Sequence, residues 1–245
     1  MADWLPIRSR FRLSDTTILV LAALMTVARS FVFVFYEGVH FDSDQAIMGL
    51  MAKHLSEASA FPVFCYGQKY LFGLDAWLAA PFFLILGATT VALKLPLLII
   101  NVLVAILLIR GLVRDGLRTE LALIAVVPFL IPTIYLTKLY VAAHGGNIEP
   151  FLGVLLVWFL RDRVLLLGVT AGIFYANREF TAYGLASLVA IDLLRGDLFT
   201  WEKLRRRLIA AAAFALVVLG IQVLGAYGAN YFGAEGRAFP LRIRR

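Results

Sequence analysis

Two carboxylates stand where a long apolar segment gives way to polar sequence. Residues 16–36 are strongly apolar, and Asp42 and Asp44 follow a few positions later. A carboxylate held at the edge of a membrane is costly to desolvate, and it can accept a proton from a reacting group. These aspartates are therefore the first candidate catalytic residues, with the alternative that Asp42 only caps a helix.

Further ionisable side chains lie in or beside apolar segments, the first segment included. They are Arg29, Lys94, Lys138, His144, Glu149 and Arg178. An ionisable group at membrane depth suggests a functional site by default. Simpler roles stay open: the lysines can extend to lipid headgroups, Arg29 can pair with an acidic neighbour, His144 can be a solvated loop residue, and Glu149 can cap a helix ahead of Pro150.

The elements that must position these residues follow from composition. The chain has 245 residues, of which 62% are hydrophobic and 16% charged, and its mean hydropathy is +0.87. Soluble domains average about 45–50% apolar residues. Backbone groups in lipid must be satisfied within each segment, and the long apolar runs lack strand alternation. We therefore expect an all-α, multi-pass transmembrane bundle, and we interpret the net charge of +7 as a topology signal rather than nucleic-acid binding.

Seven segments are candidate membrane spans: 16–36, 91–113, 119–140, 148–161, 163–177, 180–194 and 208–232. An eighth, 71–88, has a short apolar run with Pro81 inside it and Asp75 at its start, which argues against deep burial. If 71–88 does not cross, the basic loops at 110–118, 161–163 and 195–207 all face the cytoplasm, as the positive-inside rule favours. The predicted location is the cell membrane, with a cytoplasmic N-terminus.

In this topology, residues 37–90 form one external segment of a transmembrane module, 1–235, that is followed by a basic tail, 236–245. Ser43 or Asp42 caps a helix that runs to about Glu57. Its apolar stripe consists of Ile47, Met48, Leu50, Met51 and Leu55. An aromatic turn, 61–70, contributes Tyr66 and Gln68 as candidate binding residues, and 71–88 forms a second juxtamembrane helix.

The same topology gathers the ionisable residues on the extracytoplasmic face. Carboxylates, cations and a histidine above an apolar body suit a lipid-linked, anionic substrate. Its phosphate would contact the cations Lys94, Lys138, Arg178 and Arg29, while His144 and Glu149 orient the acceptor.

Three stretches of sequence resemble the GT-C superfamily of membrane glycosyltransferases. They are Phe-Asp-Ser-Asp-Gln-Ala at 41–46, Phe-Pro-Val-Phe-Cys-Tyr-Gly-Gln-Lys-Tyr at 61–70, and Gly-Ala-Thr-Thr-Val-Ala-Leu-Lys-Leu-Pro at 87–96. The likeness is closest to the protein mannosyltransferase-like and aminoarabinose-transferase-like branch. It implies a polyprenyl-phosphate sugar donor and juxtamembrane helices that do not cross.

The resemblance also implies roles for single residues. The first external loop of these enzymes carries an acidic catalytic base, usually in an Asp-Glu pair, and here Asp44-Gln45 occupies that place. The amide weakens the case for a metal bridged by both residues, so no cofactor or metal ligand is assigned. Residues 145–149 look like the second acidic loop, and Lys94 stands where relatives commonly have an arginine.

The sequence thus predicts an inverting glycosyltransferase with an aspartate base, Asp44, supported by Asp42. Its expected partners are the lipid bilayer and the sugar donor. Superfamily members are usually longer, so a fragment, a truncated copy or a short member with a membrane partner subunit is also expected. The alternative function is a non-catalytic module, either lipid-binding or transporter-like. Matching repeats of broken helices, typical of transporters, are not evident.

Overall fold

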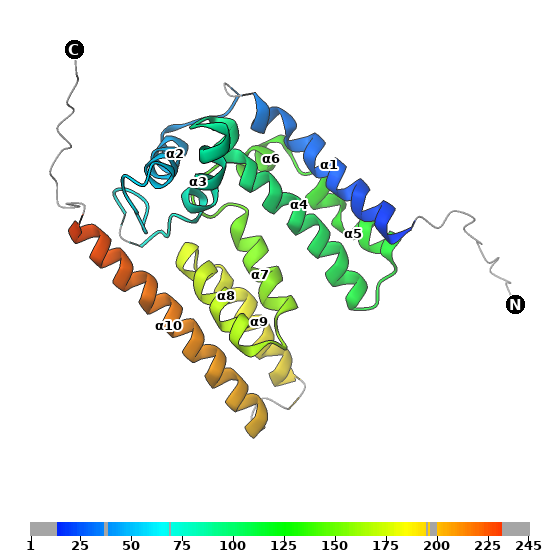
Figure 1. Ribbon diagram of the computed structural model, residues 1–245. Helices are drawn as coiled ribbons and strands as arrows, with labels where there is room; N and C mark the ends of the chain where they lie inside the picture. Colours follow the sequence, from blue (N-terminus) through cyan, green and yellow to red (C-terminus); the bar gives the residue numbers. More distant parts are fainter. Residues whose placement is uncertain (1–13, 37–38, 69, 195, 197–199, 232–245) are drawn as a thin grey trace, which may run out of the picture.

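The computed structural model describes residues 14–36, 39–68, 70–194, 196 and 200–231, and this part of the chain is all-helical (Figure 1). The only β pairing in the described residues is an isolated bridge between Phe64 and Phe72. The all-α prediction is confirmed. The helices are α1 (Asp15–Phe35), α2 (Ser43–Ser56), α3 (Leu74–Leu86), α4 (Thr90–Arg114), α5 (Thr119–Leu130), α6 (Ile134–Tyr140), α7 (Glu149–Phe159), α8 (Val164–Asn177), α9 (Thr181–Leu194) and α10 (Trp201–Tyr231).

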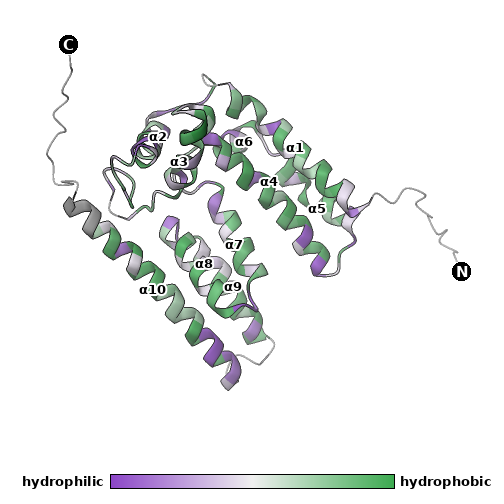
Figure 2. Cartoon of the chain, in the orientation of Figure 1, coloured by the Kyte–Doolittle hydropathy of each residue, from purple (hydrophilic) through white to green (hydrophobic). Residues whose placement is uncertain are grey.

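Three of the described helices, α1, α4 and α10, are long and apolar enough to cross a membrane. Figure 2 shows that α10 is hydrophilic in its first turns and largely hydrophobic beyond them. The helices in the predicted spans 148–161, 163–177 and 180–194 have 11, 14 and 14 residues. These helices are shorter than the roughly 20 residues that a perpendicular crossing requires. The three long helices indicate association with a membrane.

The predicted span 119–140 is not one straight helix. It consists of α5 and α6, which are bent by 90° at a short break and together pass as one broken span or a re-entrant segment. Pro132 lies in the break, and a proline restricts the residue before it and removes a backbone donor. Thr133 then starts α6, because its side chain accepts a hydrogen bond from the Leu136 N–H.

Both segments predicted as juxtamembrane form helices, α2 and α3, which pack against each other and the start of α4. Their largest apolar cluster buries Met48 and Met51 of α2 with Ala76 and Ala79 of α3. Leu50, assigned to the apolar stripe by its spacing, is instead exposed. The buried face of α2 is therefore narrower than predicted, because α3 and α4 cover only the side of Met48 and Met51.

The helix α8 packs closely along α10. A Cβ at Gly168 would lie 2.3 Å from the Ala210 carbonyl oxygen, and one at Gly172 would lie 2.8 Å from Val217 Cβ. These two glycines, four residues apart, let the two backbones approach. Only 6% of the most apolar 18-residue stretch of α10 is buried by the rest of the protein, so most of this stretch faces outward (Figure 1).

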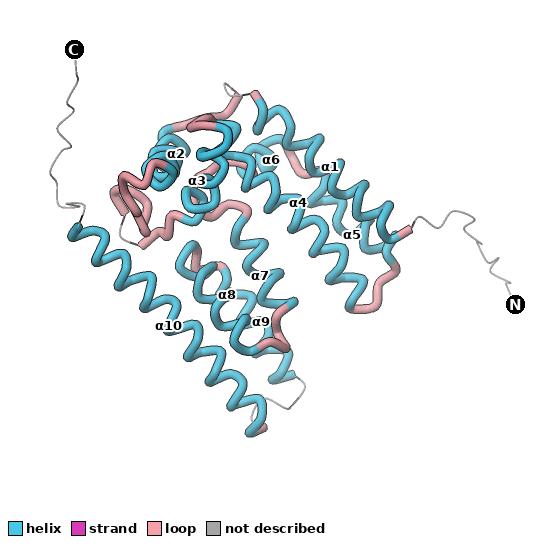
Figure 3. The backbone as a smooth tube through the Cα atoms, viewed as in Figure 1, coloured by secondary structure: helices cyan, strands magenta, loops and turns pink. Residues whose placement is uncertain are grey.

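The loops gather at two ends of the molecule. At one, the loop end, residues 39–90, 138–149 and 176–181 meet; for example, the Phe72 N–H donates to the Ala176 carbonyl at 3.2 Å. At the other, the basic end, residues 110–118, 158–163 and 201–207 meet, because Arg114 and Arg206 both bind Asp162. Figure 3 draws these loops in pink, at the ends of the helices drawn in cyan. The N-terminal arginines, Arg195 and the basic tail 236–245 lie outside the described residues.

Candidate functional site

Asp42 and His144 connect the first loop to the loop before α7. Asp42 is the N-cap of α2, and its Oδ1 accepts a hydrogen bond from the Gln45 N–H at 3.1 Å. The Nε2 atom of His144 lies 2.9 Å from Asp42 Oδ2 and 3.1 Å from Oδ1. Partial burial acts to raise the pKa of Asp42, but the hydrogen bonds from Gln45 and His144 outweigh it, so this pKa lies below its ordinary value. The capping role is confirmed, and His144 is a partner of Asp42 rather than a free loop residue.

His40 completes this group, although the sequence did not single it out. Its ring lies 6.2 Å from the His144 ring, centroid to centroid. Burial, then the charge of Lys138, lowers the pKa of His40, and Lys94 and His144 act in the same direction against the opposing effect of Asp42. The donor atoms of His40, Asp42 and His144 all lie within 4.8 Å of one another. The only signal in the sequence was the His-Phe-Asp spacing at 40–42.

Asp44 lies two residues further along, in the first turn of α2, and its side chain is exposed. No described residue forms a hydrogen bond or ion pair with its carboxylate. Its negative charge reaches the buried Cys65, whose thiol pKa is raised by burial and, secondarily, by Asp44 and Asp75. Asp44 therefore differs from Asp42, because its carboxylate remains open to a molecule that approaches from outside.

Two of the predicted phosphate-binding cations are engaged inside the protein. Lys94, 1% exposed, donates to the Phe33 carbonyl at 3.0 Å and to the His40 carbonyl, and so holds the end of α1. Arg29 donates to Asn101 Oδ1 at 2.7 Å. Its guanidinium also lies over the rings of Phe129 and Tyr140. The expectation that Arg29 pairs with an acidic neighbour is wrong, because its guanidinium instead donates to an amide oxygen and lies over two aromatic rings.

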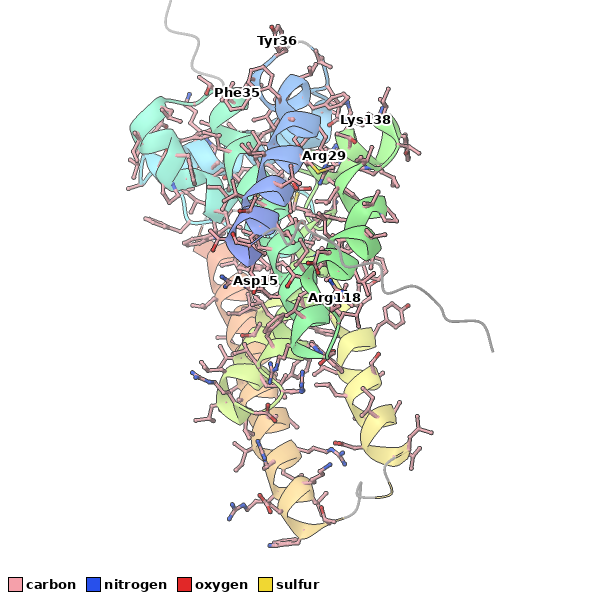
Figure 4. All side chains as sticks on the ribbon, turned by 90° about the vertical axis from the view of Figure 1, so that its right-hand side faces the viewer. Asp15, Arg29, Phe35, Tyr36, Arg118 and Lys138 are labelled. Atoms are coloured by element: carbon pink, nitrogen blue, oxygen red, sulfur yellow. The ribbon has the colours of Figure 1, made fainter. Side chains whose placement is uncertain are left out.

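Arg178 and Lys138 complete the predicted set of cations. Arg178 donates from Nε to the Gly145 carbonyl at 2.8 Å. Lys138 is half-buried near the end of α6, with its ammonium 5.5 Å from the centre of the Tyr135 ring. In Figure 4, Lys138 and Arg29 lie toward the Tyr36 end of α1, and Asp15 lies at the opposite end of that helix. Lys138 is therefore the cation of this set with the best access to a ligand at the loop end.

Asp75 and Glu149 form a fully buried carboxyl pair between α3 and α7. Asp75 Oδ2 accepts the Gly145 N–H at 2.8 Å, and Glu149 Oε2 accepts the Ile148 N–H at 3.0 Å. Burial raises the pKa of Asp75 well above its usual range, and the adjacent Glu149 adds to this. Asp75 is buried by the protein itself, because a carboxyl that keeps its proton and has a hydrogen-bond partner can be buried.

The aromatic turn places its two candidate residues differently. The Tyr66 hydroxyl lies 2.6 Å from His54 Nδ1, and burial raises the pKa of Tyr66. Gln68 has an exposed side chain in a turn closed by its N–H and the Cys65 carbonyl. Tyr66 thus helps to hold the turn against α2, and Gln68 is available at the surface.

Comparison with known proteins adds no family assignment. No protein-family model, curated protein sequence or solved structure matches the chain. The loop end offers the chemistry from which a function can be inferred: an exposed carboxylate, a carboxylate–imidazole group and an accessible ammonium.

Proposed function

We propose that the chain is a membrane glycosyltransferase module that moves a sugar from a polyprenyl-phosphate donor to an extracytoplasmic lipid, glycan or protein acceptor. One observation carries the proposal. Asp44 presents an exposed carboxylate in the first turn of α2, a helix that contacts α3 and α4. Asp42, two residues earlier, is committed to the helix cap and to His144.

In the proposed reaction, Asp44 accepts the proton of the acceptor hydroxyl or amine. The acceptor atom then bonds to the anomeric carbon, and the bond from that carbon to the phosphate oxygen breaks, with the electron pair leaving on the phosphate. A positive charge near the leaving oxygen stabilises this step. Lys138 is assigned this role because it is half-exposed at the loop end. A single displacement inverts the anomeric centre.

The proposal includes a GT-C-like arrangement with seven crossings, a cytoplasmic N-terminus and the loop end outside. The meeting of the three basic segments at one end supports this orientation, because positively charged loops are retained on the cytoplasmic side. The helices α2 and α3 would then lie at the outer membrane surface. The short helices α7, α8 and α9 would cross where the bundle thins the surrounding bilayer.

The test is sugar transfer by membranes that contain the protein, with a panel of polyprenyl-phosphate sugars as donors. Asp44→Asn should lower the rate about 10²–10⁴-fold, because a positioned general base contributes on that order. Glu57→Gln is the matched control, since Glu57 is an exposed carboxylate at the other end of α2 that pairs with Lys53 at 3.9 Å. The base assignment fails if both variants transfer sugar at the wild-type rate.

A non-catalytic module, either a lipid-binding or a transporter-like subunit, is the second candidate function. The observation that favours it is the engagement of Lys94, Arg29 and Arg178 with acceptors inside the protein. Such cations stabilise the fold without a substrate. Absence of transfer by the wild-type protein with every donor of the panel would favour this second function.

A further inference from the structure

The group formed by His40, Asp42 and His144 has the composition of a metal site. Two imidazoles and one carboxylate come from loops about 100 residues apart in sequence, and their donor atoms lie within 4.8 Å of one another. Imidazole nitrogen and carboxylate oxygen are ligands that Zn²⁺ accepts, and three protein ligands leave a coordination position open.

We propose that His40, Asp42 and His144 bind one divalent transition-metal ion, for which Zn²⁺ is the best match. The proposal is independent of the transferase reaction, because it concerns binding by the protein alone. A bound ion would join the loop before α2 to the loop before α7. Its open position would accept water or an anionic oxygen of a ligand.

The unsatisfied ring nitrogen of His40 is the second observation that points to a ligand. Its Nε2 is buried and has no hydrogen-bond partner among the described residues. A buried polar atom without a partner is unfavourable, and coordination would satisfy it.

The backbone on both sides of the group is already positioned. The buried Lys94 ammonium binds the His40 carbonyl, and the Asp42 side chain is held by its N-cap hydrogen bond. The turn that follows His144 is held by the Gly145 N–H bond to Asp75. Ligands held in this way lose little conformational freedom when an ion binds.

Asn147 on one side and the lysines near His40 on the other affect the expected affinity for the metal ion. Asn147 Nδ2 lies 3.5 Å from His144 Nδ1. Rotation of the Asn147 amide would place its oxygen at this distance, where it could accept a hydrogen bond from a protonated His144 Nδ1. That hydrogen bond would support coordination of the metal ion through His144 Nε2. The positive charges of Lys138 and Lys94 oppose a cation near His40. Lys138→Gln should therefore strengthen metal binding.

The experiment is a Zn²⁺ titration of the untagged, chelator-treated protein in detergent, measured by competition with a chromophoric chelator. One equivalent should bind, and Co²⁺ should give the visible bands of a low-symmetry nitrogen–oxygen site. His40→Ala, His144→Ala and Asp42→Asn should each weaken binding by about 100-fold or more, since loss of an outer partner alone costs about 10–100-fold. Asn also caps helices well, so Asp42→Asn removes the charge and keeps the cap.

The sequence offers a matched control in His54, the one histidine of the chain outside the proposed metal site. Its ring nitrogen binds the Tyr66 hydroxyl and it lies outside the group. His54→Ala should leave the affinity unchanged, and circular dichroism should show equal helicity for all variants. The proposal is overturned if the wild-type protein does not bind one equivalent, or if His54→Ala weakens binding as much as His40→Ala.

Discussion

The two ends of the molecule handle charge in opposite ways. At the loop end, charged side chains are buried and bind backbone groups, as Lys94 does with two carbonyls and Asp75 with the Gly145 N–H. At the basic end, charged side chains bind one another, either half-buried, as Asp192 with Lys203 and Arg207, or at the surface. Arg114, for example, lies 3.3 Å from Asp162, and both side chains are more than a third exposed.

This difference predicts which charges matter for stability. Exposed ion pairs contribute about 0–1 kcal/mol each, so a pair such as Arg114–Asp162 adds little to stability. A buried donor or acceptor that loses its partner costs about 1–3 kcal/mol. The loop end therefore depends on single side chains, and the same side chains position the candidate site.

Lys94→Met should give the largest loss of stability. The substitution leaves the Phe33 and His40 carbonyls without their ammonium partner, and it should lower the free energy of unfolding by about 2–3 kcal/mol. Thermal unfolding in detergent measures the effect. Lys138→Met is the control at the same end, because this half-exposed lysine binds no buried carbonyl. Equal losses for the two variants would remove the distinction between buried and surface charge.

Asp75→Asn should change how stability depends on pH. The folded-state pKa of Asp75 is raised, so its contribution is fully present below the unfolded value of about 3.9 and is lost as the pH rises through the folded value. Asn keeps an acceptor for Gly145 and a donor for Glu149 and does not titrate. The variant should therefore gain about 1 kcal/mol relative to the wild type as the pH rises toward neutrality.

The matched control for this pH dependence is Asp162→Asn at the basic end, where the carboxylate is exposed. In melting curves over the acid-to-neutral range, Asp162→Asn should differ from the wild type by less than about 1 kcal/mol, because its ion pair with Arg114 is exposed. If the difference between Asp75→Asn and the wild type does not change with pH, the proton that Asp75 is inferred to retain is not there.

Arg114→Ala should have the smallest effect. It removes the ion pair with Asp162 and the contact of the guanidinium with the Phe159 ring, 5.8 Å away. The expected loss is less than about 1 kcal/mol, and added salt should reduce the contribution further. A loss as large as that of Lys94→Met, measured by the same melting assay, would mean that both ends stabilise the fold in the same way.

Much of the fold was predictable because it depends on local pattern. The apolar runs identified α1, α4 and most of α10, and the Asp42 cap with the spacing of Met48 and Met51 identified α2. The break between α5 and α6 was missed. Pro132 is present in the sequence, but the mean hydropathy of a segment does not show where the helix axis changes direction.

Single residues of the candidate site could be predicted from the sequence, but the contacts between them could not. The sequence singled out Asp42 and His144 separately, yet their contact joins residues 102 positions apart. His40 was missed for the same reason. The burial of Asp75 inside the protein was not predictable, because it depends on Glu149 and the Gly145 N–H, which reach it from another loop.

The sequence by itself determined the class of the protein: helices, their approximate bounds, an apolar body and the basic segments between helices. These properties follow from composition and short-range periodicity, which act within a single segment. Tertiary structure alone decided which charges are buried and what they bind. A buried charge is stable only when another segment supplies its partner. Lys94 therefore holds the end of α1 through the His40 carbonyl, and Asp75 pairs with Glu149. His40 lies with Asp42 and His144 in a three-ligand group for the same reason.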